Sequence, residues 1–376
     1  MYTFLNQEDR DMSKKIYLTS DGYSYHTLEL RYNPTDKAYR DCFERLQQCS
    51  KAQELYPQKD PDGRIYAWRC NAFSQSGIQI FMTQGHQNLV ALTINPRKLL
   101  DPASSYLGIV PPYQDTLEEI RDQFTKLMRK AGLPEELDEW KLHRLDLCVN
   151  ICWNRKGAAA ELIRLMRVED LTPSSFEKST TGQRHEVRYS NGQLELVAYD
   201  KLLQMTREGL LKKERLPKSV LRVELRCGRA WLREFSQKKN RRTTTELIET
   251  LGKSSRELII TYAGKCMYGG MYRKLKEQLD VVESADGMKK KVRKRLKDIL
   301  KEAGDFSLRH ARHGLTDEQW KTCMNHFDRL GIHPVPLRKK YPVKKLPSLL
   351  MILKTLDDEW DTVEICKDGS LKPCIF

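Results

Sequence analysis

The stretch that decides the fold is HEVRYSNGQLELVAY, residues 185–199, in which two alternating segments flank a two-residue turn. Asn191-Gly192 is a strong signal for a β-hairpin, because both central positions of that turn need a positive φ. Alternation divides the second segment into an apolar face and a face that carries Gln193, Glu195, Val197 and Tyr199. The hairpin therefore predicts antiparallel strands, with Tyr199 on the polar side.

Two other segments show the same division into an apolar and a charged face. In HRLDLCVNI (143–151) and LRVELRC (221–227), every second residue is Leu, Val or Ile, which predicts one core face per strand. The opposite faces carry Arg144, Asp146, Cys148 and Asn150 in the first segment and Arg222, Glu224 and Arg226 in the second. Burying an unpaired charge costs several kcal/mol, so these groups need partners.

Two interpretations of these charged faces fit the sequence. In the first, the strands lie side by side and their acids and arginines satisfy one another as an ion-pair ladder. In the second, Asp146 and Glu224 converge as oxygen ligands of a divalent cation, and the arginines hold a phosphate.

The remaining segments before residue 235 mix strands with helices. Strand patterns occur in KIYLTS, RIYAWRC, GIQIFMT and LVALTIN, and AYRDCFERLQQCS has helical spacing. A second helix is expected from a cap at Asp115 or Thr116 to a stop at Gly132. The pattern predicts that an order of strand, helix and three strands is used twice. We expect an α+β fold: a central, mainly antiparallel sheet with flanking helices, built as two similar halves.

Beyond residue 235 the sequence becomes helical and basic. MKKKVRKRLKDILKEAG, residues 288–304, is an amphipathic helix whose cations lie around most of its circumference. We therefore expect two domains, residues 1–235 with the sheet and residues 236–376 as a basic helical domain. A solvated helix face is the plain alternative to phosphate contacts. The candidate DNA-binding cations here are Lys289, Lys290, Lys291, Arg293 and Arg295.

The charge balance favours a nucleic acid as the partner. Lys and Arg outnumber Asp and Glu by 66 to 51, which gives a net charge of +15. No run of about 18 apolar residues occurs, and residues 1–15 lack the apolar centre of a signal peptide, so we expect a cytoplasmic protein with no membrane partner. The ten cysteines include no CxxC pair, which favours reduced core thiols over disulfides or zinc.

Tyr199 has a structural and a chemical interpretation. Its ring could simply cover the end of the sheet, as most tyrosines at strand ends do. The chemical interpretation is favoured by Lys201, two residues on, and by the two acid-bearing strands. A phenol has an ordinary pKa of about 10, so it needs a neighbouring cation or a metal-bound phosphate to act as a nucleophile at neutral pH.

The blocks RLDLCVN, LVAYDK and LRVELR, in this order and spacing, resemble the initiator endonucleases of rolling-circle replication, specifically the filamentous-phage initiators and the related plasmid Rep family. Arg-x-Asp is matched by Arg144 and Asp146, and Leu-Val-Ala-Tyr-x-Lys is matched up to Tyr199 and Lys201. Arg-x-Glu-x-Arg is matched by Arg222, Glu224 and Arg226.

The resemblance implies a metal-dependent nicking enzyme. Tyr199 would attack a phosphodiester of single-stranded or extruded origin DNA, with Lys201 assisting the phenol. Asp146 and Glu224 would hold Mg²⁺ or Mn²⁺, while Arg144, Arg222 or Arg226 would offset charge on the phosphate. A host polymerase and helicase, in the cytoplasm of a bacterial host, would then use the released 3′-hydroxyl.

The sequence departs from the pattern of these relatives at two points, and two alternative functions stay open. The relatives commonly have a glutamate where this chain has Gln204, and no His-hydrophobe-His pair of the broader nicking class occurs. A relaxase of a mobile element would use the same chemistry on another substrate. A non-enzymatic DNA-binding regulator would need the basic helices without the polar strand faces, so its activity would survive Tyr199→Phe.

Overall fold

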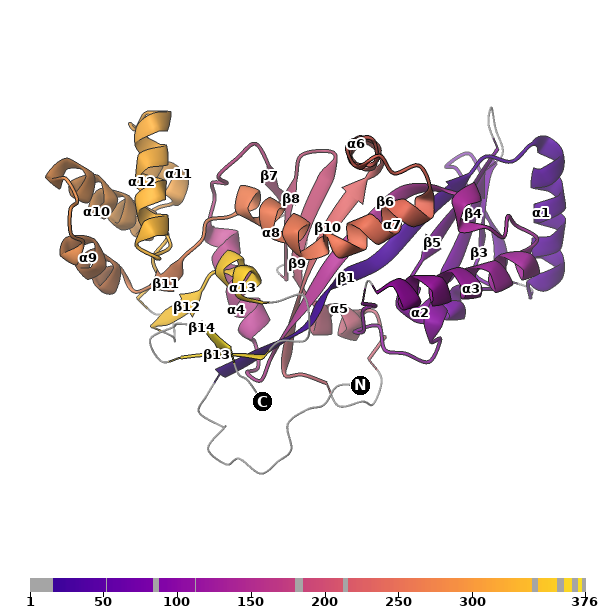
Figure 1. Cartoon of the computed structure of the whole chain (residues 1–376), viewed down its shortest axis with the longest axis horizontal. Coiled ribbons are helices and arrows are strands. Elements are labelled where there is room, and N and C mark those ends of the chain that lie inside the picture. Colours follow the sequence, from indigo (N-terminus) through magenta and orange to yellow (C-terminus); the bar gives the residue numbers. More distant parts are fainter. Residues whose placement is uncertain are drawn as a thin grey trace, which may run out of the picture.

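The computed structural model describes residues 16–51, 53–83, 88–111, 113–179, 185–211, 216–339, 344–356, 362–366 and 371–373. Its centre is a 12-stranded sheet whose paired strands run antiparallel, with helices packed around it (Figure 1). The expected α+β class with a central, mainly antiparallel sheet is confirmed. The signal-peptide argument rests on residues 1–15, which lie outside the described residues.

The sheet is built from two runs of elements with the same order of pairing. The first run contains β1 (Ile16–Tyr32), α1 (Asp36–Cys49), β2 (Leu55–Lys59), β3 (Ile65–Cys70), β4 (Ile78–Thr83) and β5 (Leu89–Ile94). The second contains β6 (Lys141–Trp153), α4 (Ala158–Val168), β7 (Glu177–Ser179), β8 (Glu186–Ser190), β9 (Leu194–Asp200) and β10 (Ser219–Gly228). The strand order is β2-β3-β4-β5-β1-β6-β10-β9-β8-β7, so the last strand of each run returns to its first. β1 and β6 form the seam between the two halves.

Local sequence signals fix several element ends. The predicted hairpin between β8 and β9 is present, but only Gly192 of the Asn-Gly pair has a positive φ, of 85°. Asn191 N donates to the Leu194 carbonyl, so Gly192 and Gln193 are the central residues of the turn. Helix α3 (Gln114–Ala131) ends at Gly132, where φ is 68°. It begins at Gln114, one residue before the expected caps, so Asp115 lies in its first turn.

The apolar face of the sheet forms the main core. Leu145, Leu147 and Val149 of β6 lie there with every second residue of β10, under α4, α6 (Arg229–Lys239), α7 (Thr244–Lys253) and α8 (Ser255–Cys266). α1 and α3 cover the same face in the first half, at the right of Figure 1. The first half of the sheet therefore has one face in the core, the usual state of an antiparallel sheet.

Among the described residues, the opposite face is covered at one end of the second half. There α5 (Lys201–Arg207) and the segment after α2 (Pro96–Leu100) enclose a small cluster of Leu107, Cys152, Met205 and Val220. Next to this cluster, polar side chains of β6, β9 and β10 line a pocket.

Residues beyond 235 divide between the sheet and a separate group of helices. α7 and α8 contact the sheet, and β13 (Thr362–Ile365) pairs with β1 and with β14 (Leu371–Pro373). A two-stranded sheet joins β11 (Met271–Arg273) to β12 (Lys345–Pro347), and α13 (Leu349–Thr355) contacts α8. The helices gathered at one end of the molecule in Figure 1 are α9 (Leu275–Ser284), α10 (Lys290–Asp305), α11 (Leu308–Arg312) and α12 (Asp317–Arg329). Within the described ranges, no helix is both long and apolar enough to cross a membrane.

Candidate active site

Three neighbouring strands bring Tyr199, Glu224 and Asp146 onto one face of the sheet. β10 lies between β6 and β9, and its register places Arg222 opposite Tyr199 and Arg226 opposite Asp146. The Tyr199 hydroxyl donates to Oε1 of Glu224 over 2.6 Å. Tyr199 is 8% exposed, so its ring is largely buried while its edge reaches the pocket. The phenol and both acids therefore share one hollow.

Guanidinium groups pair with the carboxylates of this face. Arg144 binds Asp146 through two bonds, Nε to Oδ1 at 2.7 Å and Nη2 to Oδ2 at 2.5 Å. Arg226 donates to Oε2 of Glu224 at 3.0 Å and to Oε2 of Glu195 at 2.9 Å. The ladder expected from the alternating strands is present, and it holds the acids that the catalytic interpretation also needs.

A buried polar network supports the site from below. Arg222 is 0% exposed, and it donates from Nε to Oδ1 of Asn150 at 2.7 Å and from Nη2 to the Leu107 carbonyl at 2.6 Å. Asn150 in turn donates to Asp21 of β1 at 2.6 Å. Arg222 does not line the pocket, so its guanidinium cannot contact DNA directly in this structure. Its Nη1 atom has no hydrogen-bond partner among the described residues.

His26 joins the site from the other half of the sheet. The register between β1 and β6 shifts between Tyr25 and Thr27, so His26 is an extra residue in β1. Its Nδ1 atom lies 3.9 Å from Oε1 of Glu224 and 2.8 Å from the Thr27 hydroxyl. Burial, with the charge of Arg222, lowers the pKa of His26 to about 3. The imidazole is therefore neutral at neutral pH.

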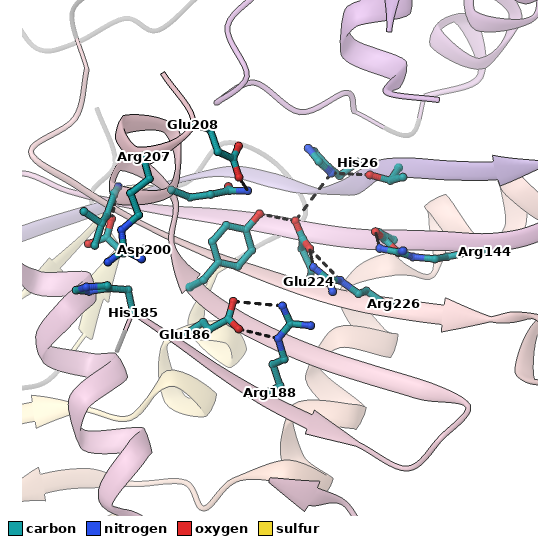
Figure 2. A pocket seen from close by; sticks show the side chains of 15 residues that line it. His26, Arg144, His185, Glu186, Arg188, Asp200, Arg207, Glu208, Glu224 and Arg226 are labelled. Carbon is teal, nitrogen blue, oxygen red and sulfur yellow. Dashed lines mark hydrogen bonds and ion pairs between the residues drawn. The ribbon is translucent and has the colours of Figure 1, made fainter. Parts of the chain in front are cut away.

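The pocket has a volume of about 360 Å³ and opens between α5 and the polar ends of the strands (Figure 2). Arg188 of β8 pairs with Glu186 at 2.8 Å and closes the side opposite His26. The other lining residues are Thr27, Arg144, Asp146, His185, Tyr199, Asp200, Leu203, Gln204, Arg207, Glu208, Glu224 and Arg226. The walls thus carry four arginines, Arg144, Arg188, Arg207 and Arg226, and five acids, and a phosphate would have to take arginines such as Arg144 and Arg226 from their carboxylate partners.

The surroundings shift the pKa values of Tyr199 and Glu224 in opposite directions. Burial and the charge of Glu224 raise the pKa of Tyr199 well above its ordinary value. Burial acts against the Glu224 anion, but the charges of Arg226 and Arg222 and the hydrogen bond from Tyr199 outweigh it and hold the pKa of Glu224 below its ordinary value. The resting site therefore holds a protonated phenol hydrogen-bonded to a carboxylate anion.

Asp146 and Lys201 have pKa values that move toward neutrality. Burial raises the pKa of Asp146 to about 6, although Arg144 opposes that change. Burial and the charge of Arg222 lower the pKa of Lys201 to about 7. Lys201 is buried at the start of α5, with Nζ 2.9 Å from Oε1 of Gln204 and 5.9 Å from the centre of the Tyr199 ring. It lies beside the phenol ring and outside the pocket wall.

The donor set does not form a ready metal centre. Carboxylate oxygens are the ligands that Mg²⁺ and Mn²⁺ prefer. All four carboxylate oxygens of Asp146 and Glu224 accept hydrogen bonds from Arg144, Arg226 or Tyr199. Throughout the described part of the chain, no three His, Cys, Asp or Glu side chains lie close enough together to hold an ion. A cation between these acids would require Arg144 or Arg226 to move.

The basic helix α10 lies away from the pocket. Lys289, Lys290 and Lys291 are exposed at its start, where they are free to meet a phosphate backbone. Arg293 donates instead to the Ala285 carbonyl at 2.7 Å, and Arg295 is half-buried. The lysines are thus better placed for DNA than the two arginines.

Several residues of the site were not singled out from the sequence. Glu186 and Arg188 alternate with Val187 and Tyr189, so the polar face of β8 had a readable signal. His26 had none, because an extra residue in a strand reverses the alternation on which such predictions depend. Asp21 lies at another register shift of β1.

The chain matches no family model, and no curated protein matches it.

Proposed function

We propose that this protein is a rolling-circle replication initiator that nicks and rejoins origin DNA through Tyr199. The observation that carries the proposal is the 2.6 Å bond from the Tyr199 hydroxyl to Glu224 at the wall of an arginine-lined pocket. A structural tyrosine needs no such combination of a buried anion and neighbouring arginines. The resemblance of three sequence blocks to the initiator endonucleases points to the same chemistry.

The reaction exchanges one phosphoester for another. The Tyr199 oxygen attacks the phosphorus, the bond to the 3′ oxygen breaks, and a 5′-phosphotyrosine and a free 3′-hydroxyl result. The phenol proton passes to Glu224 and from there to the departing 3′ oxygen. Because the phosphoester bond is kept, the reverse reaction rejoins the strand without a nucleotide cofactor.

Binding of the phosphate would activate the resting site. Because the pKa of Glu224 is held below its ordinary value and that of Tyr199 is raised well above its own, transfer of the phenol proton to Glu224 is strongly uphill in the resting site. A phosphate that takes Arg226 and Arg144 removes cations from the carboxylates, which raises the pKa of Glu224. Arg222, opposite Tyr199 in the register and with Nη1 unpaired among the described residues, stabilises the phenolate.

The proposal includes a divalent cation, although the described side chains are not arranged around one. Mg²⁺ or Mn²⁺ would supply charge stabilisation at the phosphate, and Asp146 would be its candidate ligand once Arg144 is displaced, whereas Glu224, the second ligand that the resemblance implies, is assigned here to the proton. Origin DNA, a host polymerase and a helicase are the proposed partners. The relaxase of a mobile element would use the same site on a different origin.

The test is a covalent adduct with labelled single-stranded origin-like oligonucleotides and Mn²⁺, separated after denaturation. Wild-type protein should form the adduct, Tyr199→Phe should not, and Tyr189→Phe should behave like wild type. Tyr189 is a matched control, because it lies in the core with no hydrogen-bond partner for its hydroxyl among the described residues. DNA binding without any wild-type adduct would refute nicking and favour a regulator.

A further inference from the structure

On the polar side of the first half of the sheet, many of the described side chains reach solvent. Burial in β4 alternates, with Ile78, Ile80 and Met82 in the core and the residues between them partly or fully exposed. β5 shows the same alternation, and Thr93 is exposed. α1 and α3 pack on the core side, so the helices of this half leave the polar side free.

One row of side chains crosses six strands on this open side. The register places Tyr56, Arg69, Phe81, Ala91, Arg31 and Lys141 opposite one another in succession, from β2 to β6. Directly opposed residues of antiparallel strands point to the same face. With strands about 4.8 Å apart, the row is roughly 24 Å long. We call this row the open-face row.

The open-face row leads to the pocket across the seam. Arg31 binds Glu29 at 3.0 Å, and Glu29 lies opposite Arg144, which lines the pocket. Thr27, the next residue of β1 on this face, lies opposite Asp146 and also lines the pocket. One continuous sheet surface therefore runs from Tyr56 to the tyrosine site.

The chemistry of the open-face row fits a single nucleic-acid strand. Arg69 and Lys141 are exposed, and Phe81 and Tyr56 are half-buried with the cations beside them in the row. Single strands bind where aromatic rings stack on bases and cations follow the phosphates. At one end of the row, Arg69 lies between the rings of Tyr56 and Phe81, and Lys141 is an exposed cation at the other end, whereas Arg31 is paired with Glu29.

We propose that the open-face row binds the single-stranded DNA that flanks the bond to be broken. The proposal rests on the proposed function, because it assigns to that reaction the surface which leads the strand to Tyr199. In this arrangement the second half of the sheet carries the reacting groups and the first half carries the strand.

Binding of a fluorescein-labelled oligo(dT) strand, measured by anisotropy, tests the proposal. Phe81→Ala should weaken binding about tenfold, the loss expected from one stacking ring, and Phe81→Tyr should restore it. Arg69→Ala should also weaken binding, whereas Arg40→Ala should not, because Arg40 is exposed on α1 on the other side of the sheet. Equal thermal melting would show that each variant is folded.

A second readout separates this proposal from nicking itself. Ultraviolet cross-linking of a bromodeoxyuridine strand should label the peptide that contains Phe81. Wild-type affinity in both Phe81→Ala and Arg69→Ala, with adduct formation intact, would overturn the open-face row and leave the proposed function standing. Weakened binding in these variants, without any adduct in wild type, would refute nicking and leave the row standing.

Discussion

Replacement of Glu224 by glutamine separates the two roles that its bond to Tyr199 allows. The amide keeps the shape and an acceptor oxygen but removes the negative charge. If Glu224 only orients the phenol, the change from a charged to a neutral acceptor costs about 1 kcal/mol, or roughly fivefold in the rate of adduct formation. If Glu224 accepts the proton, the loss should be about 10²- to 10⁴-fold.

We expect the larger loss, because no other anion contacts the Tyr199 hydroxyl in the described structure. The assay is single-turnover adduct formation with saturating DNA, so that binding does not limit the rate. Glu195→Gln is the matched control, since Glu195 binds the same Arg226 at 2.9 Å without bonding to the tyrosine. A rate for Glu224→Gln within about tenfold of wild type would refute the role as base, and equal losses in both variants would assign the effect to Arg226.

Three further outcomes follow from the geometry. Burial holds the pKa of Lys201 near 7 in the folded chain, below its unfolded value, so at this group the unfolded state binds more protons above that pH. The difference in stability between wild type and Lys201→Met, measured by chemical denaturation, should therefore shift in favour of wild type from pH 7 to 10. Simultaneous replacement of Lys289, Lys290 and Lys291 by alanine should weaken the salt dependence of duplex binding. The slope of log affinity against log salt concentration should fall by about 0.9 for each lost phosphate contact. Lys126→Ala, an exposed position on α3, should leave this slope unchanged. Chelation by EDTA should stop adduct formation and Mn²⁺ should restore it; an undiminished rate in EDTA would remove the cation from the proposal.

Alternation within strands predicted much of the site. The polar faces of β6, β9 and β10 could be read from the sequence, and the structure brings Tyr199, Glu224 and Asp146 together on them. The repeated order of a strand, a helix and later strands could also be predicted, but each half has four strands after its helix and not the three expected from the sequence.

The features of the site that could not be predicted depend on contacts between segments that are distant in the sequence. Arg222 shares a polar strand face with Arg226, yet Arg222 is enclosed by the Leu107 carbonyl and the Asn150 side chain. No local sequence pattern shows which part of a strand face is covered by a loop from a distant segment. The pairing of each carboxylate with an arginine likewise decides whether a cation can enter. Residue types alone leave that choice open.

The seam between β1 and β6 has a consequence for any attempt to divide this protein. β1 supplies His26 and Asp21 to a centre whose other members come from the second half, and it is also the neighbour that β6 pairs with along most of its length. A fragment that starts at Lys141 would expose the backbone of β6 as a bare edge and would lose the acceptor beneath Asn150. Catalysis and solubility should therefore disappear together on truncation, and only co-expression of both fragments should recover them.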